Sequence, residues 1–292
     1  MLQEDIKTVY FDHNALIEII EKRTDCFFLF DSGHNIRVVA SLWNLYEITG
    51  SLALEQALNL AKYLDKDNVY WLQDKRFIQS QELQAFIYTS YYSFPMIIEN
   101  PIRMYISEAL ATLNDPTSII VNFTPSKLVK AWHKNKSLLV EIETSKEKTV
   151  IALKTMQQAK KNKGITQAIH KEIQLKFLRG LFPRRNPQGR PILEDELNLI
   201  LDYCICNIKH LYKMCPAIQL EYILAFMRAS DPKRKPEKQD APDLQHAVSS
   251  IAYCDYFFTK ERFLTNCAKY AVKHCKLRTK IISSISELVK IL

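Results

Sequence analysis

The N-terminal part of the chain alternates short apolar runs with stretches that space apolar residues at three and four. The first run, IKTVYFD at residues 6–12, is rich in β-branched and aromatic residues and predicts a strand that ends on an acid. Behind it, Asn14 stands at the N-cap position of the helical segment ALIEIIEK. A second extended segment or hairpin around residues 31–35 is expected to finish with IRVVAS. Ser41 and Gly50 are placed to begin and end the helix that follows it.

The pattern continues with a predicted helix over 52–64 and a strand, VYWL, over 69–72. Strands and helices that alternate at this spacing predict an α/β sheet whose strands are mostly parallel. From residue 80 to residue 228 the spacing is almost entirely helical. Two basic, proline-rich loops, at 183–191 and 230–242, stand out from these helices.

The α/β rhythm returns near the C-terminus. DLQHAVSSIAY predicts a helix led by Asp243, YFFT a strand, and KERFLTNCAKYAVKH a helix that begins near Glu261; a last strand and a short helix follow. We therefore expect one α/β domain built from residues 1–90 and 236–292, with an all-α insertion of residues 91–235 between its two parts.

Composition narrows the class of protein. The 292 residues include only five glycines, which argues against a turn-rich all-β fold and against a glycine-rich phosphate loop. The longest apolar runs are too short to span a bilayer, and the start, MLQEDIKTVYFD, has acids where a secretory signal would be basic and apolar. We expect a cytoplasmic protein with no membrane segment. Seven cysteines without C-x-x-C spacing predict reduced, mostly buried thiols.

The net charge of +8 is concentrated in the middle of the chain. Residues 126–240 carry 23 Lys and Arg against 12 Asp and Glu, a net +11, whereas the rest of the chain has a net −3. This asymmetry indicates an anionic partner, most commonly a nucleic acid, although a solvated basic helical surface explains it equally well. The residues expected to contact backbone phosphates are Arg184, Arg185, Arg190, Lys233, Arg234, Lys235 and Lys238.

Four acids occupy similar positions relative to the predicted elements. Asp12 ends the first strand, Glu47 lies on the helix after a strand, Asp243 starts a helix, and Glu261 begins the helix after another strand. The carboxyl ends of strands are where open α/β sheets bind ligands. Acids that converge there repel one another unless a hard cation, Mg²⁺ or Mn²⁺, is present, and such a site can activate water against a phosphodiester. Taken singly, each acid is explained as a helix cap or a first-turn residue.

Three segments, in this order, resemble the PIN domain, a nuclease family of three-layer α/β/α architecture. The first is VYFDHNALIEII, with an acid and an asparagine after the strand, and the second is VVASLWNLYEI, with Ser41 ahead of Glu47. The third, DLQHAVSSIAYCDYFFTKERFL, is similar to the family's D-x-x-x-A helix, its cysteine-aspartate-aromatic strand and its threonine followed by an acid. The resemblance covers residues 1–90 and 236–292.

This resemblance implies an endoribonuclease that cleaves single-stranded RNA with Mg²⁺ or Mn²⁺. The implied catalytic and metal-binding set is Asp12, Glu47, Asp243 and Glu261. The family more often has aspartate at the fourth position, so Asp240, three residues before Asp243, competes with Glu261 for that role. The residues expected to support this set are Asn14, Ser41, Asp240, His246, Asp255 and Thr259. Simple capping explains Asn14 and Ser41 equally well, while strand-end packing for Thr259 and ordinary hydrogen bonding for His246 are the plainer explanations. Asp255 is expected to be structural or to lie outside the direct ligands.

Two other functions stay open at this point. One is a catalytically weak or inactive module that keeps the fold and binds nucleic acid or protein, which the glutamate at position 261 favours. The other is a nuclease specific for DNA or for a branched structure. The insertion also leaves room for a second copy of the chain or another protein as partner.

Overall fold

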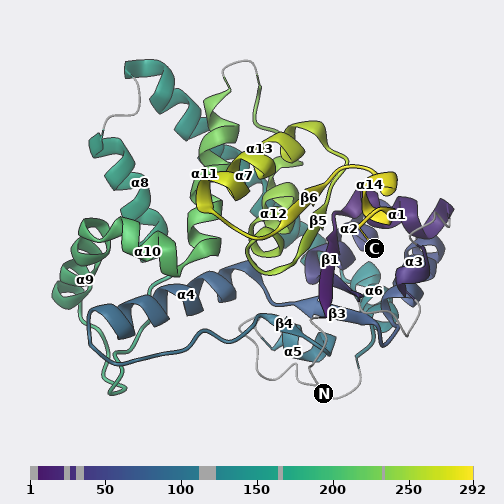
Figure 1. Cartoon of the computed structure of the whole chain (residues 1–292), viewed down its shortest axis with the longest axis horizontal. Helices are drawn as coiled ribbons and strands as arrows, with labels where there is room; N and C mark the ends of the chain where they lie inside the picture. Colours follow the sequence, from purple (N-terminus) through teal and green to yellow (C-terminus); the bar gives the residue numbers. More distant parts are fainter. Residues whose placement is uncertain are drawn as a thin grey trace.

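One sheet of six strands, in the order β4-β3-β2-β1-β5-β6, forms the centre of the molecule (Figure 1). The structure, a computed structural model, describes residues 6–22, 27–30, 36–111, 123–163, 167–231 and 234–291. The parallel strands are β1 (Lys7–Phe11), β2 (Ile36–Ser41), β3 (Val69–Leu72), β5 (Tyr256–Phe258) and β6 (Lys280–Ile282). The short β4 (Ile102–Arg103) joins β3 antiparallel at the edge.

The two ends of the chain meet in the middle of this sheet. Val9 of β1 pairs with Tyr256 of β5 and also lies in register with Val38 of β2. The expected α/β sheet with mostly parallel strands is therefore confirmed, and the strands predicted at residues 69–72 and near the C-terminus are present.

Helices cover both faces of the sheet, so the body has three layers (Figure 1). Side chains alternate along β1: Val9 and Phe11 enter the core on one face, and Tyr10 enters the core on the other. The first face is covered by α1 (His13–Lys22), α2 (Leu42–Ser51), α3 (Leu54–Leu64), α5 (Ile106–Leu110), α6 (Pro125–Lys134) and α14 (Ile285–Val289). The second is covered by α11 (Pro216–Ser230), α12 (Asp240–Tyr253), α13 (Arg262–Cys275) and the start of α4 (Lys75–Ser90).

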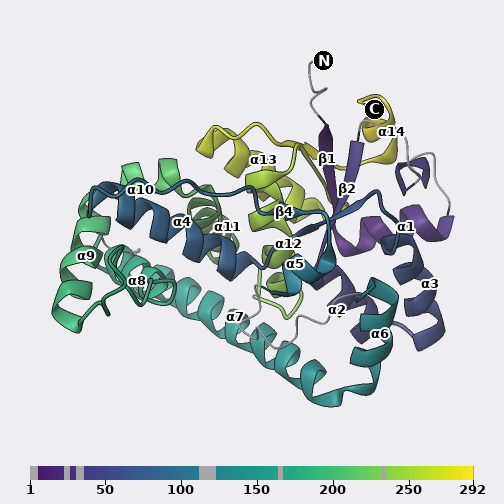
Figure 2. The same cartoon turned by 90° about the horizontal axis from the view of Figure 1, so that it is seen from below.

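The middle of the chain builds a second helical core beside the sheet. It is formed by α4 and α11 together with α8 (Gln167–Arg179), α9 (Glu194–Cys206) and α10 (Ile208–Met214). The long helix α7 (Lys136–Lys163) runs from α6 to α8 along the side of the sheet where the strands end, and it contacts α2, α11 and α12 (Figure 2). None of the helices in the described ranges is long and apolar enough to cross a bilayer.

The sequence-based expectations were wrong at a few element boundaries. The first arm of the expected hairpin is a short 3-10 helix, η1 (Phe27–Phe30), while the turn expected at 31–35 lies outside the described residues. Helix α1 begins at His13, and its cap is Asp12 rather than Asn14, because Asp12 Oδ1 accepts a hydrogen bond from the Ala15 backbone at 2.8 Å.

Two more boundaries differ for identifiable reasons. Helix α12 starts at Asp240, so Asp243 lies within its first turn; Pro242 is tolerated there because first-turn N–H groups need no helical partner. The segment that follows α4, expected to be helical, instead returns to the edge of the sheet and forms β4. The described cysteines are free, and four of them, Cys204, Cys215, Cys254 and Cys267, are buried as expected.

Candidate functional site

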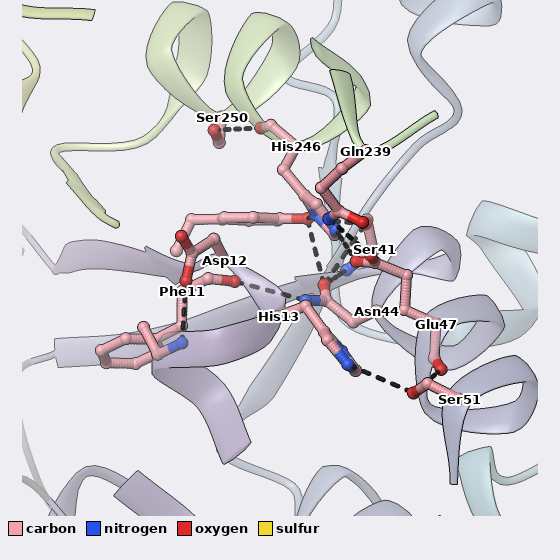
Figure 3. Close-up of polar contacts among 12 residues, drawn as sticks. Phe11, Asp12, His13, Ser41, Asn44, Glu47, Ser51, Gln239, His246 and Ser250 are labelled. Carbon is pink, nitrogen blue, oxygen red and sulfur yellow. Dashed lines mark hydrogen bonds and ion pairs between the residues drawn. The ribbon is translucent and has the colours of Figure 1, made fainter. Parts of the chain in front are cut away.

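The polar residues expected at the strand ends gather at the carboxyl edge of β1 and β2, below the first turns of α12 (Figure 3). Asp12 follows β1 directly and Ser41 is the last residue of β2. Glu47 lies farther along α2, and His246 projects from α12 toward it (Figure 3). Because β1 and β2 are parallel neighbours, their carboxyl ends lie side by side, so these residues meet although they are distant in sequence.

His246 is the centre of this arrangement. Its Nε2 lies 2.5 Å from Glu47 Oε2, and its Nδ1 lies 2.6 Å from the Tyr10 hydroxyl. The side chain is only 2% exposed. Since both ring nitrogens are engaged, His246 holds Glu47 in place and has no free nitrogen to offer a substrate.

The Tyr10 hydroxyl is also held by the buried side chains of Ser41 and Asn44. The Tyr10 hydroxyl lies 2.7 Å from Ser41 Oγ and donates to Asn44 Oδ1 at 3.0 Å. Asn44 Oδ1 also accepts the Ser41 backbone N–H at 2.8 Å, and Asn44 Nδ2 donates to the Phe11 carbonyl at 3.2 Å. Sequence reasoning missed Tyr10 and Asn44, although the S-x-x-N spacing after a strand is a signal for a capping residue at position 44.

Glu47 and His246 shift each other's pKa values. Burial alone would raise the pKa of Glu47, but the adjacent His246 outweighs burial and holds the pKa of Glu47 below its usual value. Burial alone would lower the pKa of His246, whereas Glu47, Asp12 and Asp243 together raise it. Glu47 and His246 therefore each favour the charged form of the other, and two further acids act on the same ring.

The other two acids have shifts in the opposite direction. Burial raises the pKa of Asp12 above its usual value, although hydrogen bonds from Thr259 and from the Ala15 backbone oppose the rise. Burial likewise raises the pKa of Asp243 to about 6, against the pull of Arg228. Buried carboxylates with raised pKa values are typical of functional sites.

A buried arginine, absent from the expected site, joins the cluster from α11. Arg228 is 2% exposed, forms an ion pair with Asp240, and donates to Asp243 Oδ2 at 3.0 Å. Arg234 Nη2 also donates to Asp240 Oδ1, at 2.6 Å, and both guanidinium groups lie over the Phe263 ring. Arg228 and Arg234 thus hold the first turn of α12 against α11 and α13.

The geometry separates the two acids that competed for the fourth position. Asp240 is 1% exposed and both of its oxygens are engaged, one by the two arginines and the other by the Glu237 backbone N–H at 2.9 Å. Glu261 has a side chain that is 34% exposed; it caps α13 by accepting the Leu264 N–H and lies 4.0 Å from Arg234. Glu261 is therefore the more accessible of the two acids.

The acids of the described cluster have the chemistry of a divalent-cation site but not its arrangement. The oxygens of Asp12, Glu47 and Asp243 suit a hard ion such as Mg²⁺ or Mn²⁺ by their chemistry. Within the described residues, however, no group of three or more His, Cys, Asp or Glu side chains is arranged to hold one ion. In this arrangement His246 and Arg228 supply the positive charge, so an ion would require Glu47 and Asp243 to turn away from them.

An open cavity of about 380 Å³ adjoins Glu47 on the solvent side of the cluster. Its walls come from the start of α1, the end of α2, the first half of α7 and the residue before α12. Its lining residues are His13, Asn14, Tyr46, Glu47, Gly50, Ser51, Glu143, Lys146 and Gln239. Burial lowers the pKa of His13, which favours a neutral ring there. Asn14, expected to orient the acids, is an exposed residue of this cavity.

Other expected residues lie in different surroundings. Thr259 is fully buried, and its Oγ1 accepts the Glu261 N–H at 3.2 Å. Asp255 lies at the opposite end of the sheet, where its Oδ2 accepts the Thr8 N–H at 2.9 Å, so its contacts are structural.

The basic residues divide into two groups. The first group, Arg184, Arg185 and Arg190, is exposed beyond the C-terminal end of α4, where Tyr88 donates to the Arg185 carbonyl. The site lies at the other end of α4, near the sheet (Figure 1). The 16 residues of α4 span about 24 Å. The second group lies close to the site: Arg234 is bound to Asp240, Lys235 is exposed, and Lys238 pairs with two glutamates of α7, while Lys233 lies outside the described residues.

Comparisons of this chain with protein-family models, with curated proteins and with solved structures find no match.

Proposed function

We propose that this chain is a Mg²⁺- or Mn²⁺-dependent endonuclease that hydrolyses phosphodiester bonds in single-stranded RNA. The observation that carries the proposal is the convergence of Asp12, Glu47 and Asp243, from three distant parts of the chain, around His246. Burying several carboxylates at one sheet edge is costly unless a cation compensates them, and proteins keep such costs mainly at functional sites. The order of these acids along the chain also resembles that of the PIN domain.

In this proposal each residue has a limited role. Asp12, Glu47 and Asp243 would hold the ion, with the more exposed Glu261 at its outer side. The bound ion would supply a water of lowered pKa and neutralise charge on the phosphodiester. His246 would compensate the charge of Glu47 only until the ion binds, because Glu47 would then turn from His246 to the ion.

The net reaction adds one water across the phosphodiester. The water oxygen bonds to phosphorus, the bond between phosphorus and the 3′-oxygen breaks, and one proton of the water ends on that oxygen. The products are a 5′-phosphate and a 3′-hydroxyl end.

A second candidate function has its own supporting observation. Glu47 is paired with His246 and Asp243 with Arg228, so the acids are already compensated by cations of the protein itself. A module that binds nucleic acid or protein without cleaving it needs nothing more than this arrangement. The two candidates differ in whether catalysis depends on the acids.

Cleavage assays with matched variants test the proposal. Wild type, Asp12→Asn and Asp243→Asn are compared on single-stranded RNA, single-stranded DNA and a flap duplex in Mn²⁺, with folding checked by circular dichroism. We expect RNA cleavage to fall about 100-fold or more in both variants, since each removes a charged ligand. Asp202→Asn, an exposed acid of α9, is the control and should cleave as wild type does. Equal cleavage by Asp12→Asn and wild type would refute the proposal, and a preference for DNA or flaps would reassign the substrate.

A further inference from the structure

The cavity beside Glu47, called here the Glu47 cavity, is built partly by segments from the predicted insertion. Tyr46, one of its lining residues, packs against Trp132 of α6 with ring centroids 4.5 Å apart. Glu143 and Lys146 of α7 form the opposite wall. The cavity is therefore part of the same structural unit as the acid cluster, with which it shares Glu47.

The α7 wall is held in place by several contacts. Gln157 Nε2 donates to the backbone carbonyls of Asp231 and Arg234, at 2.8 Å each. Lys238 lies 3.3 Å from a carboxylate oxygen of Glu143 and 3.0 Å from one of Glu147. These contacts fix α7 to the segment that leads into α12, so the cavity does not depend on a loose helix.

The lining suits an uncharged, hydrogen-bonding ring better than a bare phosphate. Lys146 is paired with Glu143 at 2.8 Å, so this wall carries little net positive charge, and the Glu47 carboxylate in the lining repels an anion. The remaining polar groups are neutral: the amides of Asn14 and Gln239, the hydroxyl of Ser51 and the ring of His13. Side-chain amides offer both donors and acceptors, which is what reading a base edge requires.

The bonds of two lining residues leave specific groups for a ligand. Gln239 Nε2 donates to Glu47 Oε1 at 3.4 Å, which leaves the Gln239 carbonyl oxygen as an acceptor. Ser51 Oγ donates to the Glu47 carbonyl at 2.5 Å and lies 3.5 Å from His13 Nε2, which leaves one of its lone pairs to accept. The exposed Asn14 amide adds donors at the mouth. A volume of about 380 Å³ lies within the range of small-molecule sites.

We propose that the Glu47 cavity is a nucleobase pocket that takes one unstacked base of single-stranded RNA next to the phosphodiester that is cleaved, and that it gives the enzyme a base preference. This inference rests on the proposed function for its substrate class. Sequence-specific recognition of RNA uses bases that are splayed out of single strands and bonded along their edges, and this cavity offers one such place. Asn14 and Gln239 are then specificity-determining residues, and the insertion contributes through Lys146 and the Tyr46–Trp132 packing.

A binding measurement tests the pocket without depending on cleavage. The four ribonucleoside 5′-monophosphates are titrated into the full chain, and tryptophan fluorescence is followed because Trp132 packs on the Tyr46 ring of the cavity. We expect one base to bind about tenfold or more tightly than the weakest, as base-edge contacts allow. In the double variant Asn14→Ala, Gln239→Ala that ratio should fall below about threefold.

The control is the double variant Asn59→Ala, Gln188→Ala, which removes the same two side-chain types from exposed positions outside the cavity and should keep the wild-type ratio. Equal binding of all four bases by wild type, or an unchanged ratio in the cavity variant, would overturn the inference.

A second readout separates this inference from the proposed function. Cleavage sites on a random-sequence RNA library should show a base preference that the cavity variant loses. Cleavage that depends on Asp12 but shows no base preference would overturn the pocket and leave the nuclease standing. A base-selective pocket in a chain that does not cleave RNA would support the pocket and refute the nuclease.

Discussion

Arg228 is the buried cation that ties the first turn of α12 to α11, and its replacement by methionine removes that charge while keeping an unbranched apolar side chain. Arg228 is 2% exposed and binds Asp240, itself 1% exposed, as well as Asp243 at 3.0 Å. Removing one partner of a buried ion pair costs about 3–5 kcal/mol, because the remaining charge stays buried without compensation. Asp240 keeps its bond to Arg234, so we expect the lower end, about 3 kcal/mol.

The stability that Arg228→Met loses should also depend on pH, because the pKa of Asp243 depends on Arg228. The folded-state pKa of Asp243 is raised to about 6 by burial, above its unfolded value, so the folded state holds this proton more tightly. The stability that the Asp243 proton contributes is fully present below the unfolded pKa of Asp243, and it is lost as pH rises through about 6. Without Arg228 the pKa of Asp243 rises further, so the Arg228→Met variant should lose more stability at about pH 8 than at about pH 5.

Thermal unfolding followed by circular dichroism measures both effects. For a chain of 292 residues, a loss of about 3 kcal/mol corresponds to a fall in Tm of about 5 °C near neutral pH. Arg179→Met is the matched control, since Arg179 pairs with Glu194 on the surface and exposed pairs contribute less than about 1 kcal/mol. An Arg228→Met variant that unfolds within about 1 °C of wild type, or that loses the same amount at both pH values, would refute this reasoning.

Two further predictions concern titration. In Glu47→Gln, burial acts on His246 without the opposing Glu47 carboxylate, so the pKa of His246 should fall. An NMR titration of the His246 ring measures this pKa, and an unchanged value would show that Glu47 and His246 are not coupled. Burial also raises the pKa of Glu82 to about 7, so wild-type stability should fall by up to about 3 kcal/mol as pH rises from the unfolded pKa to about 7. Chemical unfolding at several pH values measures this loss, and Glu82→Gln should no longer lose stability over that pH range. A loss that persists in Glu82→Gln would show that other groups cause it.

Local sequence signals were sufficient for the five parallel strands of the sheet and for the positions of three acids relative to them. β1 and β3 follow β-branched and aromatic runs, and the acids at positions 12, 47 and 243 are marked by their distance from a strand end or a helix start. A parallel sheet then brings its carboxyl ends to one edge without further information. This is why the sequence predicts that Asp12, Glu47 and Asp243 lie at one edge of the sheet.

The cations of the site could not be named in the same way. Arg228 lies within a helix of a strongly basic region, and nothing adjacent in sequence distinguishes it from an exposed arginine; only the packing of α11 on α12 buries it. Tyr10 is one of several aromatic strand residues, and its hydroxyl partners come from segments 31 to 236 residues away. Composition likewise singled out both basic loops, while the fold places only the second, around Arg234, beside the acids.

Isothermal titration calorimetry with Mn²⁺ tests the central claim most directly, because the proposed nuclease requires the acids to exchange His246 and Arg228 for a metal ion. The account predicts that wild type and the surface control Asp202→Asn bind Mn²⁺ with a dissociation constant below about 1 mM and that Asp12→Asn does not. Absence of Mn²⁺ binding by wild type in the millimolar range, or equal binding by Asp12→Asn, would contradict it and favour a module that binds its partner without metal chemistry.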